Sequence, residues 1–142
     1  MSPSISILSP ILHQILLLSE STPEQEICGL LSGLPGPTPT ITHLHSTRNI
    51  SPTPRTSYEI DPAEIFPIVR SMRAAGHELL GIYHSHPASA NFPSSRDIEL
   101  AYHPDAAYFI STLLPYAPQK IRAFRLAPHQ PALELTIIEI PA

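Results

Sequence analysis

Two histidines and an aspartate lie close together in this sequence, directly after an apolar run. The run 79–83 leads into His84 and His86, which are separated by a single serine, and Asp97 follows further along. Side chains alternate between the two faces of a strand, so a strand through this segment turns both imidazoles to the same face. Two histidines and one carboxylate, with a fourth position open to water, form the ligand set of a catalytic zinc site. The alternative is a loop with unrelated polar residues.

The segment before Asp97 is typical of a helix start. Ser94 or Ser95 can act as the N-cap, because a serine side chain accepts a hydrogen bond from a free backbone N–H group of the first turn. The expected helix covers 96–102 and places Asp97 in its first turn. The loop 87–93 then joins the two halves of the predicted metal site.

The whole set of residues resembles the signature of the JAMM metallopeptidases, which are also called MPN+ domains. That pattern has a distant glutamate, then His-Ser/Thr-His-Pro, a serine separated from the second histidine by seven residues, and an aspartate three positions beyond that serine. The matching residues here are Glu26, His84, Ser85, His86, Pro87, Ser94 and Asp97, with no departure in spacing. The resemblance implies one Zn2+ ion per chain, held by His84, His86 and Asp97, with Glu26 as the general base. It covers nearly the whole chain and implies a single domain over 1–142.

Glu26 stands where a helix is expected to end and a strand to begin. Taken alone, it fits a solvated loop glutamate, which is the usual environment of a carboxylate. However, the segment from Pro23 to Gly33 resembles the N-terminal block of bacterial JAMM-like proteins. This resemblance favours Glu26 as the base, while Glu24 stays open as a rival candidate.

Metal-assisted hydrolysis of an amide bond is the chemistry that these residues predict. Zinc in an open site lowers the pKa of its bound water to about 7 and polarises the scissile carbonyl group. Glu26 is expected to take the water proton and to pass it to the leaving amine. Ser94 can donate a hydrogen bond to the developing oxyanion. It can also serve only as the helix cap, and both roles hold if Ser95 caps the helix.

The substrate class follows from the family resemblance alone. The resemblance implies cleavage after the C-terminal Gly-Gly of ubiquitin or a ubiquitin-like protein, and short prokaryotic members are associated with small sulfur-carrier proteins. A chain of 142 residues has little room for the insertions that clamp ubiquitin in larger members, so we expect a sulfur-carrier or other ubiquitin-like partner. The alternative is a catalytically silent MPN-type scaffold, which needs no metal. A zinc deaminase needs two cysteines in its signature, and this chain has one.

Composition places the chain among compact globular proteins. It has 142 residues, of which 42% are hydrophobic and 14% charged, and a net charge of −4 without a basic cluster for nucleic acid. The single cysteine excludes an internal disulfide. No signal peptide is evident, and the apolar segment 11–18 is too short to span a bilayer. We therefore expect a cytoplasmic protein with no membrane contact, whose oligomeric state the sequence leaves open.

The hydrophobic periodicity predicts an α/β fold with about seven strands and three helices, in which helices cover both faces of a mixed sheet. The JAMM resemblance implies the same α-β-α layers, with an architecture like that of the cytidine deaminases. Segment 56–60 is one of the expected strands. Ser9 is expected to cap the first helix, and Asp61 with Glu64 to form a capping box for the second.

A second pair of histidines repeats the spacing of the first. His43 and His45 share a face of the predicted strand 40–46, but no proline and no aspartate in register follow them. We therefore expect an exposed edge there rather than a metal site.

Cys28 offers a different chemistry, because it lies two residues from Glu26 and on the same face if both belong to a strand. A cysteine and a histidine can form a nucleophilic pair. A free cysteine is more often a small buried residue, and a zinc site explains more of the motif. The sequence therefore favours the buried role.

Substitution of Cys28 separates zinc chemistry from cysteine chemistry. Cys28→Ala is expected to retain most of the peptidase activity, because the thiol takes no part in a metal-assisted reaction. A metal chelator is expected to abolish the activity reversibly in both proteins. A chelator-resistant activity that a thiol alkylating agent removes would instead support the cysteine-histidine pair.

Overall fold

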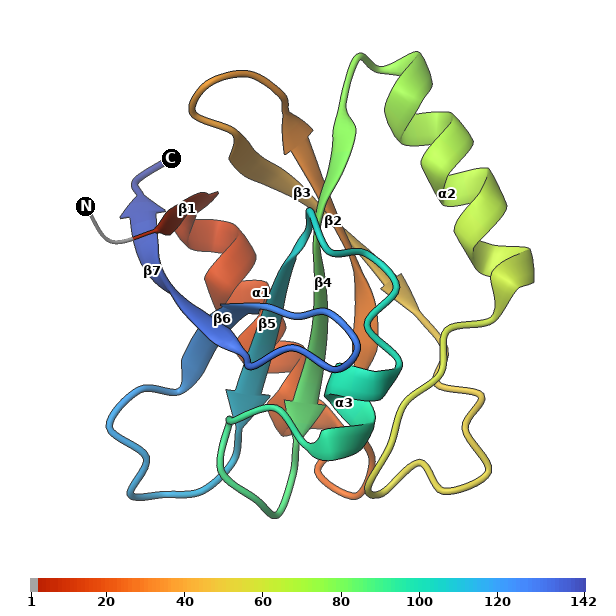
Figure 1. Cartoon of the computed structure of the whole chain (residues 1–142), viewed down its shortest axis with the longest axis vertical. Coiled ribbons are helices and arrows are strands. Elements are labelled where there is room, and N and C mark those ends of the chain that lie inside the picture. Colours follow the sequence, from red (N-terminus) through yellow and green to blue (C-terminus); the bar gives the residue numbers. More distant parts are fainter. Residues whose placement is uncertain (1–2) are drawn as a thin grey trace.

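The strands of this protein form one mixed sheet whose two ends meet (Figure 1). The computed structural model describes residues 3–142. Its strands are β1 (Ser4–Leu8), β2 (Cys28–Leu34), β3 (Thr40–Thr47), β4 (Glu78–His86), β5 (Ala107–Thr112), β6 (Ile121–Arg125) and β7 (Leu133–Ile140), and its helices are α1 (Ser9–Ser21), α2 (Pro62–Ala74) and α3 (Ser95–Glu99). Neighbouring strands follow the order β1-β3-β2-β4-β5-β6-β7.

The pairing of β1 with β7 closes the sheet. These two strands run parallel and pair along the whole of β1, from Ser4 to Leu8. On its other side, β1 pairs with β3 only at Ser6 and Ile7. This closure could not be predicted from the sequence, because alternation identifies strands without saying which strands pair.

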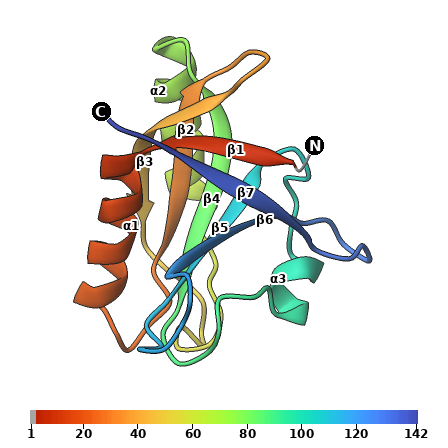
Figure 2. The ribbon, with the colours of Figure 1, turned by 90° about the vertical axis from the view of Figure 1, so that its left-hand side faces the viewer.

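Two apolar clusters lie on opposite faces of the sheet, and helices cover both of them. Ile11 and Ile15 of α1 join Phe109 in the first cluster, whereas Ile65 of α2 packs against the second, which contains Ile82. Figure 2 shows α1 and α3 on opposite sides of the sheet. The predicted mixed α/β fold, with helices on both faces of a sheet, is therefore confirmed.

The strand β4 carries the two motif histidines through the middle of the sheet. It lies between β2 and β5 and is buried over its second half. Ile82 belongs to the cluster on the α2 face, and Tyr83 belongs to the cluster on the α1 face. Because side chains alternate along a strand, His84 and His86 continue on the face of Ile82.

Segment 56–60 is not a strand, contrary to the prediction from its sequence. Only Ile60 forms a bridge, and its partner is Asn49. Asn49 Nδ2 donates to the Ser57 carbonyl group at 2.9 Å, and Asn49 Oδ1 accepts from the backbone N–H of Glu59 at 3.1 Å. A side chain, rather than a neighbouring strand, thus satisfies these backbone groups.

The first helix begins differently from the prediction. Ser9 lies inside α1, and Leu8 occupies the N-cap position without a side-chain hydrogen bond. The Ser9 hydroxyl group donates instead to Glu139 Oε2 at 2.5 Å. Closure of the sheet brings β7 beside β1, so the partner of Ser9 comes from the other end of the chain.

The predicted capping box of the second helix is only half formed. Asp61 Oδ1 accepts a hydrogen bond from Ala63 N at 2.9 Å. Glu64 Oε2 accepts from the backbone N–H of Arg48 at 3.0 Å, so it anchors the preceding loop.

The helices are short. The two longest, α1 and α2, have 13 residues each, and α3 ends at Glu99 rather than at the predicted residue 102. Within residues 3–142, no helix combines the length and the apolar character that crossing a membrane requires.

Candidate metal centre

The side chains of His84, His86 and Asp97 meet at one point. His84 Nε2 lies 3.2 Å from His86 Nε2 and 3.2 Å from Asp97 Oδ2. His86 Nε2 lies 3.1 Å from the same carboxylate oxygen. Ligand atoms of a tetrahedral zinc site, each about 2.0–2.1 Å from the metal, stand about 3.3 Å apart. The three atoms therefore form a triangle of the size of one face of a zinc coordination sphere.

The loop after β4 determines how His86 is protonated. His86 Nδ1 lies 2.7 Å from the carbonyl oxygen of Ala90, and because a carbonyl oxygen only accepts, Nδ1 carries a proton. In the neutral imidazole, the lone pair of Nε2 then faces Asp97 Oδ2 at 3.1 Å. Two acceptors at this distance need a cation between them. Either a second proton on the imidazole or a metal ion meets that need.

The pKa values of the metal-free site follow from burial and from the close carboxylate. Burial lowers the pKa of His84. Burial also acts to lower the pKa of His86, but Asp97 and the Ala90 carbonyl group outweigh it and raise this pKa. Asp97 is buried too, yet the two imidazoles and the Ser94 N–H hold its pKa far below its usual range. The carboxylate is thus ionised and His84 is neutral, which are the states that bind metals.

Reciprocal hydrogen bonds hold Asp97 in place. Ser94 is the N-cap of α3, and its Oγ accepts from the Asp97 N–H at 3.0 Å. The Ser94 N–H donates to Asp97 Oδ2 at 2.9 Å, which completes a capping box. Thr112 Oγ1 donates to the Ser89 carbonyl group at 2.7 Å and anchors the loop between the histidines and α3.

Glu26 lies beside the two histidines and is almost fully buried. One of its oxygens is within 4.8 Å of a ring nitrogen of both His84 and His86, and 4% of its surface is exposed. The Glu26 N–H donates to the Pro54 carbonyl group at 2.7 Å. Its own carbonyl group accepts from Asn49 Nδ2 at 3.0 Å. Contacts from the loop 48–57 therefore keep this carboxylate at the site.

Burial raises the pKa of Glu26 to about 8, with Asp97 adding to the rise and His86 partly offsetting it. Glu26 Oε1 has no hydrogen-bond partner within the part of the chain that the structure describes. Glu24, the rival candidate, is exposed, whereas Glu26, His84 and His86 each place a possible ligand atom within 4.8 Å of the others. The geometry thus brings Glu26, and not Glu24, to the histidines.

These donors fit a divalent transition metal. Imidazole nitrogens and carboxylate oxygens are ordinary zinc ligands, and the ligand atoms of His84, His86 and Asp97 already have the required spacing. A buried polar atom without a partner costs free energy. Glu26 Oε1 has no partner among the described residues. This atom therefore also indicates that the site is complete only with a further polar species beside the Glu26 carboxylate.

Cys28 lies near the site, but its surroundings do not activate it. Its Sγ contacts Thr47 Oγ1 at 3.6 Å and the Arg48 carbonyl oxygen at 3.7 Å. Burial raises the pKa of the thiol to about 11. A reactive cysteine needs a thiolate, and this environment keeps the thiol protonated at neutral pH.

The second pair of histidines has partners of its own. His45 Nε2 forms a hydrogen bond with Ser32 Oγ at 2.7 Å, and the His43 ring lies against His77 at 4.7 Å between centroids. Burial, together with His43 and His77, lowers the pKa of His45. His43 and His45 therefore have partners other than His84, His86 and Asp97.

Asn49 resembles an asparagine that is often found in this loop in the JAMM family, and the structure shows the contacts that it makes. Its two amide atoms hold Glu26 and the segment before α2, through bonds of 2.9–3.1 Å. A lone asparagine in an irregular loop gives no signal by spacing. Its structural partners are set by the fold and become visible only there.

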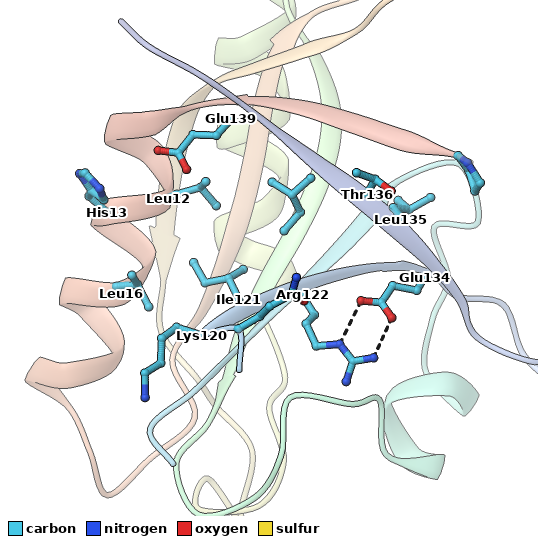
Figure 3. Close-up of a pocket in the computed structure, with 13 residues that line it drawn as sticks. Leu12, His13, Leu16, Lys120, Ile121, Arg122, Glu134, Leu135, Thr136 and Glu139 are labelled. Carbon is cyan, nitrogen blue, oxygen red and sulfur yellow. Dashed lines mark hydrogen bonds and ion pairs between the residues drawn. The ribbon is translucent and has the colours of Figure 1, made fainter. Parts of the chain in front are cut away.

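A cavity of about 420 Å3 lies directly beside the site. Asp97 lines it together with apolar side chains that include Ile60 and Leu100. A larger hollow of about 650 Å3 lies between α1 and β6–β7, where Leu12 and Ile121 line it (Figure 3). None of the predicted site residues lines the larger hollow, so the smaller cavity is the one next to the chemistry.

Comparison with known proteins places the chain in a family. The family of prokaryotic homologs of the JAB domain matches residues 8–127. The chain belongs to this family. The resemblance to short prokaryotic JAMM/MPN proteins, predicted from the motif, is thereby confirmed.

Named relatives of this JAB-family chain occur in archaea and bacteria. A desampylase of Haloferax volcanii is 40% identical over 88 residues, which are 62% of this chain and 63% of that protein. A CysO-cysteine peptidase of Mycobacterium tuberculosis is 36% identical over 102 residues, which are 71% of this chain and 68% of that protein. The solution structure of protein DSY2949 from Desulfitobacterium hafniense has a TM-score of 0.83 and 29% identity, and it covers 97% of this chain and 94% of that one.

The raised pKa of Glu26 predicts how the stability of the metal-free protein depends on pH. The pKa rises from 4.5 to about 8 on folding, so the folded state binds an extra proton between these values. The free energy of unfolding therefore falls as pH rises through this window, by roughly 1.4 kcal/mol for each unit of difference in pKa.

Glu26→Gln removes this titration. With a chelator present, we expect the variant to be more stable than the parent at pH near 8, by roughly a few kcal/mol. The advantage is expected to shrink as pH falls towards 5, where the parent carboxyl group is protonated. Urea unfolding at both pH values measures the difference. A difference in stability that does not change with pH would contradict the raised pKa.

Proposed function

We propose that this JAB-family chain is a zinc-dependent peptidase that cleaves peptide or isopeptide bonds after the C-terminal Gly-Gly of a ubiquitin-like or sulfur-carrier protein. The observation that carries the proposal is the spacing of three ligand atoms at 3.1–3.2 Å, next to a buried glutamate. A catalytic zinc site combines three protein ligands with one open position. The names of the relatives, a desampylase and a CysO-cysteine peptidase, support this type of reaction.

His84, His86 and Asp97 would hold the ion. Bound zinc supplies Lewis acidity, which lowers the pKa of a water molecule and polarises a carbonyl group. The hydrogen bond from His86 Nδ1 to Ala90 and the capping box at Asp97 orient two of the three ligands in advance. Such preorganisation reduces the free energy needed to order the site when a metal binds.

Glu26 acts as the general base in this proposal. Its pKa of about 8 applies to the metal-free protein, and a nearby positive charge favours the ionised carboxylate. Glu26 Oε1, which has no partner among the described residues, is then free to accept a proton from water and to pass it to the leaving amine.

Ser94 stabilises the oxyanion in this proposal. Its Oγ accepts a hydrogen bond from the Asp97 N–H, and a hydroxyl group that accepts one bond keeps its own proton for another. Ser94 is also exposed, so a substrate can reach it. Of the two serines that the sequence offered as helix caps, Ser94 occupies the N-cap position, and capping through its acceptor leaves its donor free for an oxyanion.

The cavity beside Asp97 is the proposed site for the substrate tail. It measures about 420 Å3, and the side chains of Ile60, Ile65 and Leu100 supply an apolar wall. A narrow, flexible Gly-Gly tail fits such a cavity without large side-chain pockets. A silent scaffold remains the rival function, and zinc content discriminates between the two because a scaffold needs no ion.

A cleavage assay tests the proposed function. The zinc-loaded protein is incubated with fusions in which a ubiquitin-like or sulfur-carrier protein ending in Gly-Gly precedes a reporter segment. Mass spectrometry then locates the cut. We expect cleavage directly after the second glycine, and no cleavage in a matched fusion that ends in Ala-Ala. A zinc-loaded protein that cuts no Gly-Gly fusion contradicts the proposal.

The metal ligands are tested by substitution. His84→Ala, His86→Ala and Asp97→Ala are each expected to lose zinc and activity, because each removes one of three ligand atoms. His43→Ala and His45→Ala are the matched controls, since these histidines repeat the spacing but have other partners. Metal content by mass spectrometry after dialysis provides the measurement. Normal zinc occupancy in Asp97→Ala would remove this residue from the ligand set.

The base is tested by an isosteric change. Glu26→Gln keeps the size of the side chain but cannot accept the proton of water. We expect normal zinc content and a decrease in kcat of about 10²–10⁴-fold, which is the usual contribution of a general base. Glu24→Gln, two positions away and exposed, is expected to keep the parent rate. Hydrolysis at the parent rate by a zinc-loaded Glu26→Gln protein would exclude Glu26 as the base.

A further inference from the structure

The two motif histidines differ in what holds their second ring nitrogen. His86 Nδ1 donates to the Ala90 carbonyl oxygen at 2.7 Å. His84 Nδ1 is buried and has no hydrogen-bond partner among residues 3–142. Histidines that bind metals almost always use this nitrogen to fix the orientation of the ring. The orientation of His84 must therefore come from another contact.

An aromatic ring supplies that contact. The ring of Tyr58 stacks on the imidazole of His84, with 4.3 Å between the centroids and 22° between the planes. His84 itself is completely buried, at 0% exposure, so the ring cannot tilt without displacing Tyr58. We propose that Tyr58 is a positioning residue, which orients His84 for metal binding by stacking instead of by a hydrogen bond.

Asn49 holds the backbone of the two residues that flank Tyr58. Its Nδ2 donates to the carbonyl group of Ser57 at 2.9 Å, and its Oδ1 accepts from the N–H of Glu59 at 3.1 Å. The same Nδ2 donates to the carbonyl group of Glu26 at 3.0 Å. One side chain thus connects the backbone that carries Tyr58 to the backbone that carries the proposed base. Tyr58 therefore lies in an irregular segment, between the two backbone groups that Asn49 holds.

Tyr58 also forms part of the wall between His84 and the adjacent cavity. Tyr58 lines the cavity of about 420 Å3, whereas His84 does not. Stacking needs the aromatic ring and not the hydroxyl group, so phenylalanine preserves the contact and an aliphatic side chain does not. This inference rests on the metal site of the proposed function, but it concerns metal binding and not the bond that is cleaved.

Metal affinity tests the inference without a substrate. Zinc binding to the parent, Tyr58→Phe and Tyr58→Leu is measured by competition with a chromophoric chelator. The visible spectrum of each Co2+-loaded form reports the coordination geometry. We expect Tyr58→Phe to match the parent in both measurements. Tyr58→Leu is expected to bind zinc about 10–100-fold more weakly, as substitutions of groups that orient metal ligands do, and to change the Co2+ spectrum.

Tyr102→Leu is the matched control. Tyr102 lines the same cavity but is 70% exposed, so its loss is expected to leave zinc affinity and the Co2+ spectrum unchanged. Parent affinity and spectrum in Tyr58→Leu would overturn the inference. An equal loss in Tyr58→Phe and Tyr58→Leu would also overturn it, because the hydroxyl group would then be the part that matters.

A measurement on the parent covers the case in which Tyr58→Leu does not fold. In the metal-free protein, the imidazole protons of His84 lie over an aromatic ring, so their NMR signals are expected upfield of ordinary histidine signals. Ordinary chemical shifts for His84 would overturn the inference.

A parent that binds zinc but cuts no Gly-Gly fusion contradicts the proposed function and leaves the Tyr58 test intact. If the parent binds no zinc, the proposed function fails and the NMR signals decide the stacking.

Discussion

His84 Nε2, His86 Nε2 and Asp97 Oδ2 approach one another to 3.1–3.2 Å inside an almost fully buried site, and the surrounding structure serves to hold them there. Each of these atoms can offer a lone pair, and the Ala90 carbonyl group obliges His86 to offer one when the ring is neutral. Lone pairs that converge in a buried site are unfavourable unless a cation lies between them. The fold therefore maintains an arrangement that is costly by itself and becomes favourable with a proton or a metal ion. This is the expected property of a preorganised metal site.

Three separate segments supply the side chains of this site, and hydrogen bonds or core packing hold each of them. Strand β4 supplies both imidazoles because its alternation continues from the core residue Ile82. The start of α3 supplies Asp97 through the capping box with Ser94. Asn49 ties the turn that carries Glu26 to the segment before α2. These anchors depend on particular side chains, because Ser94 Oγ accepts from the Asp97 N–H and Asn49 Nδ2 donates to the Glu26 carbonyl group.

Much of this arrangement could be predicted from the sequence, for a physical reason in each case. Period-two alternation places His84 and His86 on one face, and serine caps place Asp97 in a first helical turn. Both rules are local, so spacing alone is sufficient to apply them. The apolar patterns likewise predicted a mixed sheet between helices, because burial on two faces leaves a periodic trace in the sequence.

The missed features depend on contacts between distant segments. The β1–β7 pairing and the bond from Ser9 to Glu139 join opposite ends of the chain, and no local pattern encodes them. Residues 56–60 were expected to form a short strand, but the Asn49 side chain bonds the Ser57 carbonyl group and the Glu59 N–H, and no strand forms. The stacking of Tyr58 on His84 follows from that irregular path, so it could not be deduced before the path was known.

The location of a bound metal ion tests the central claim most directly. A crystal of the zinc-loaded protein, measured on both sides of the zinc absorption edge, gives an anomalous difference map that shows zinc alone. The account predicts one peak bonded to His84 Nε2, His86 Nε2 and Asp97 Oδ2, at about 2.0–2.2 Å from each atom. A zinc peak at His43 and His45, with none between the three predicted ligand atoms, would contradict it.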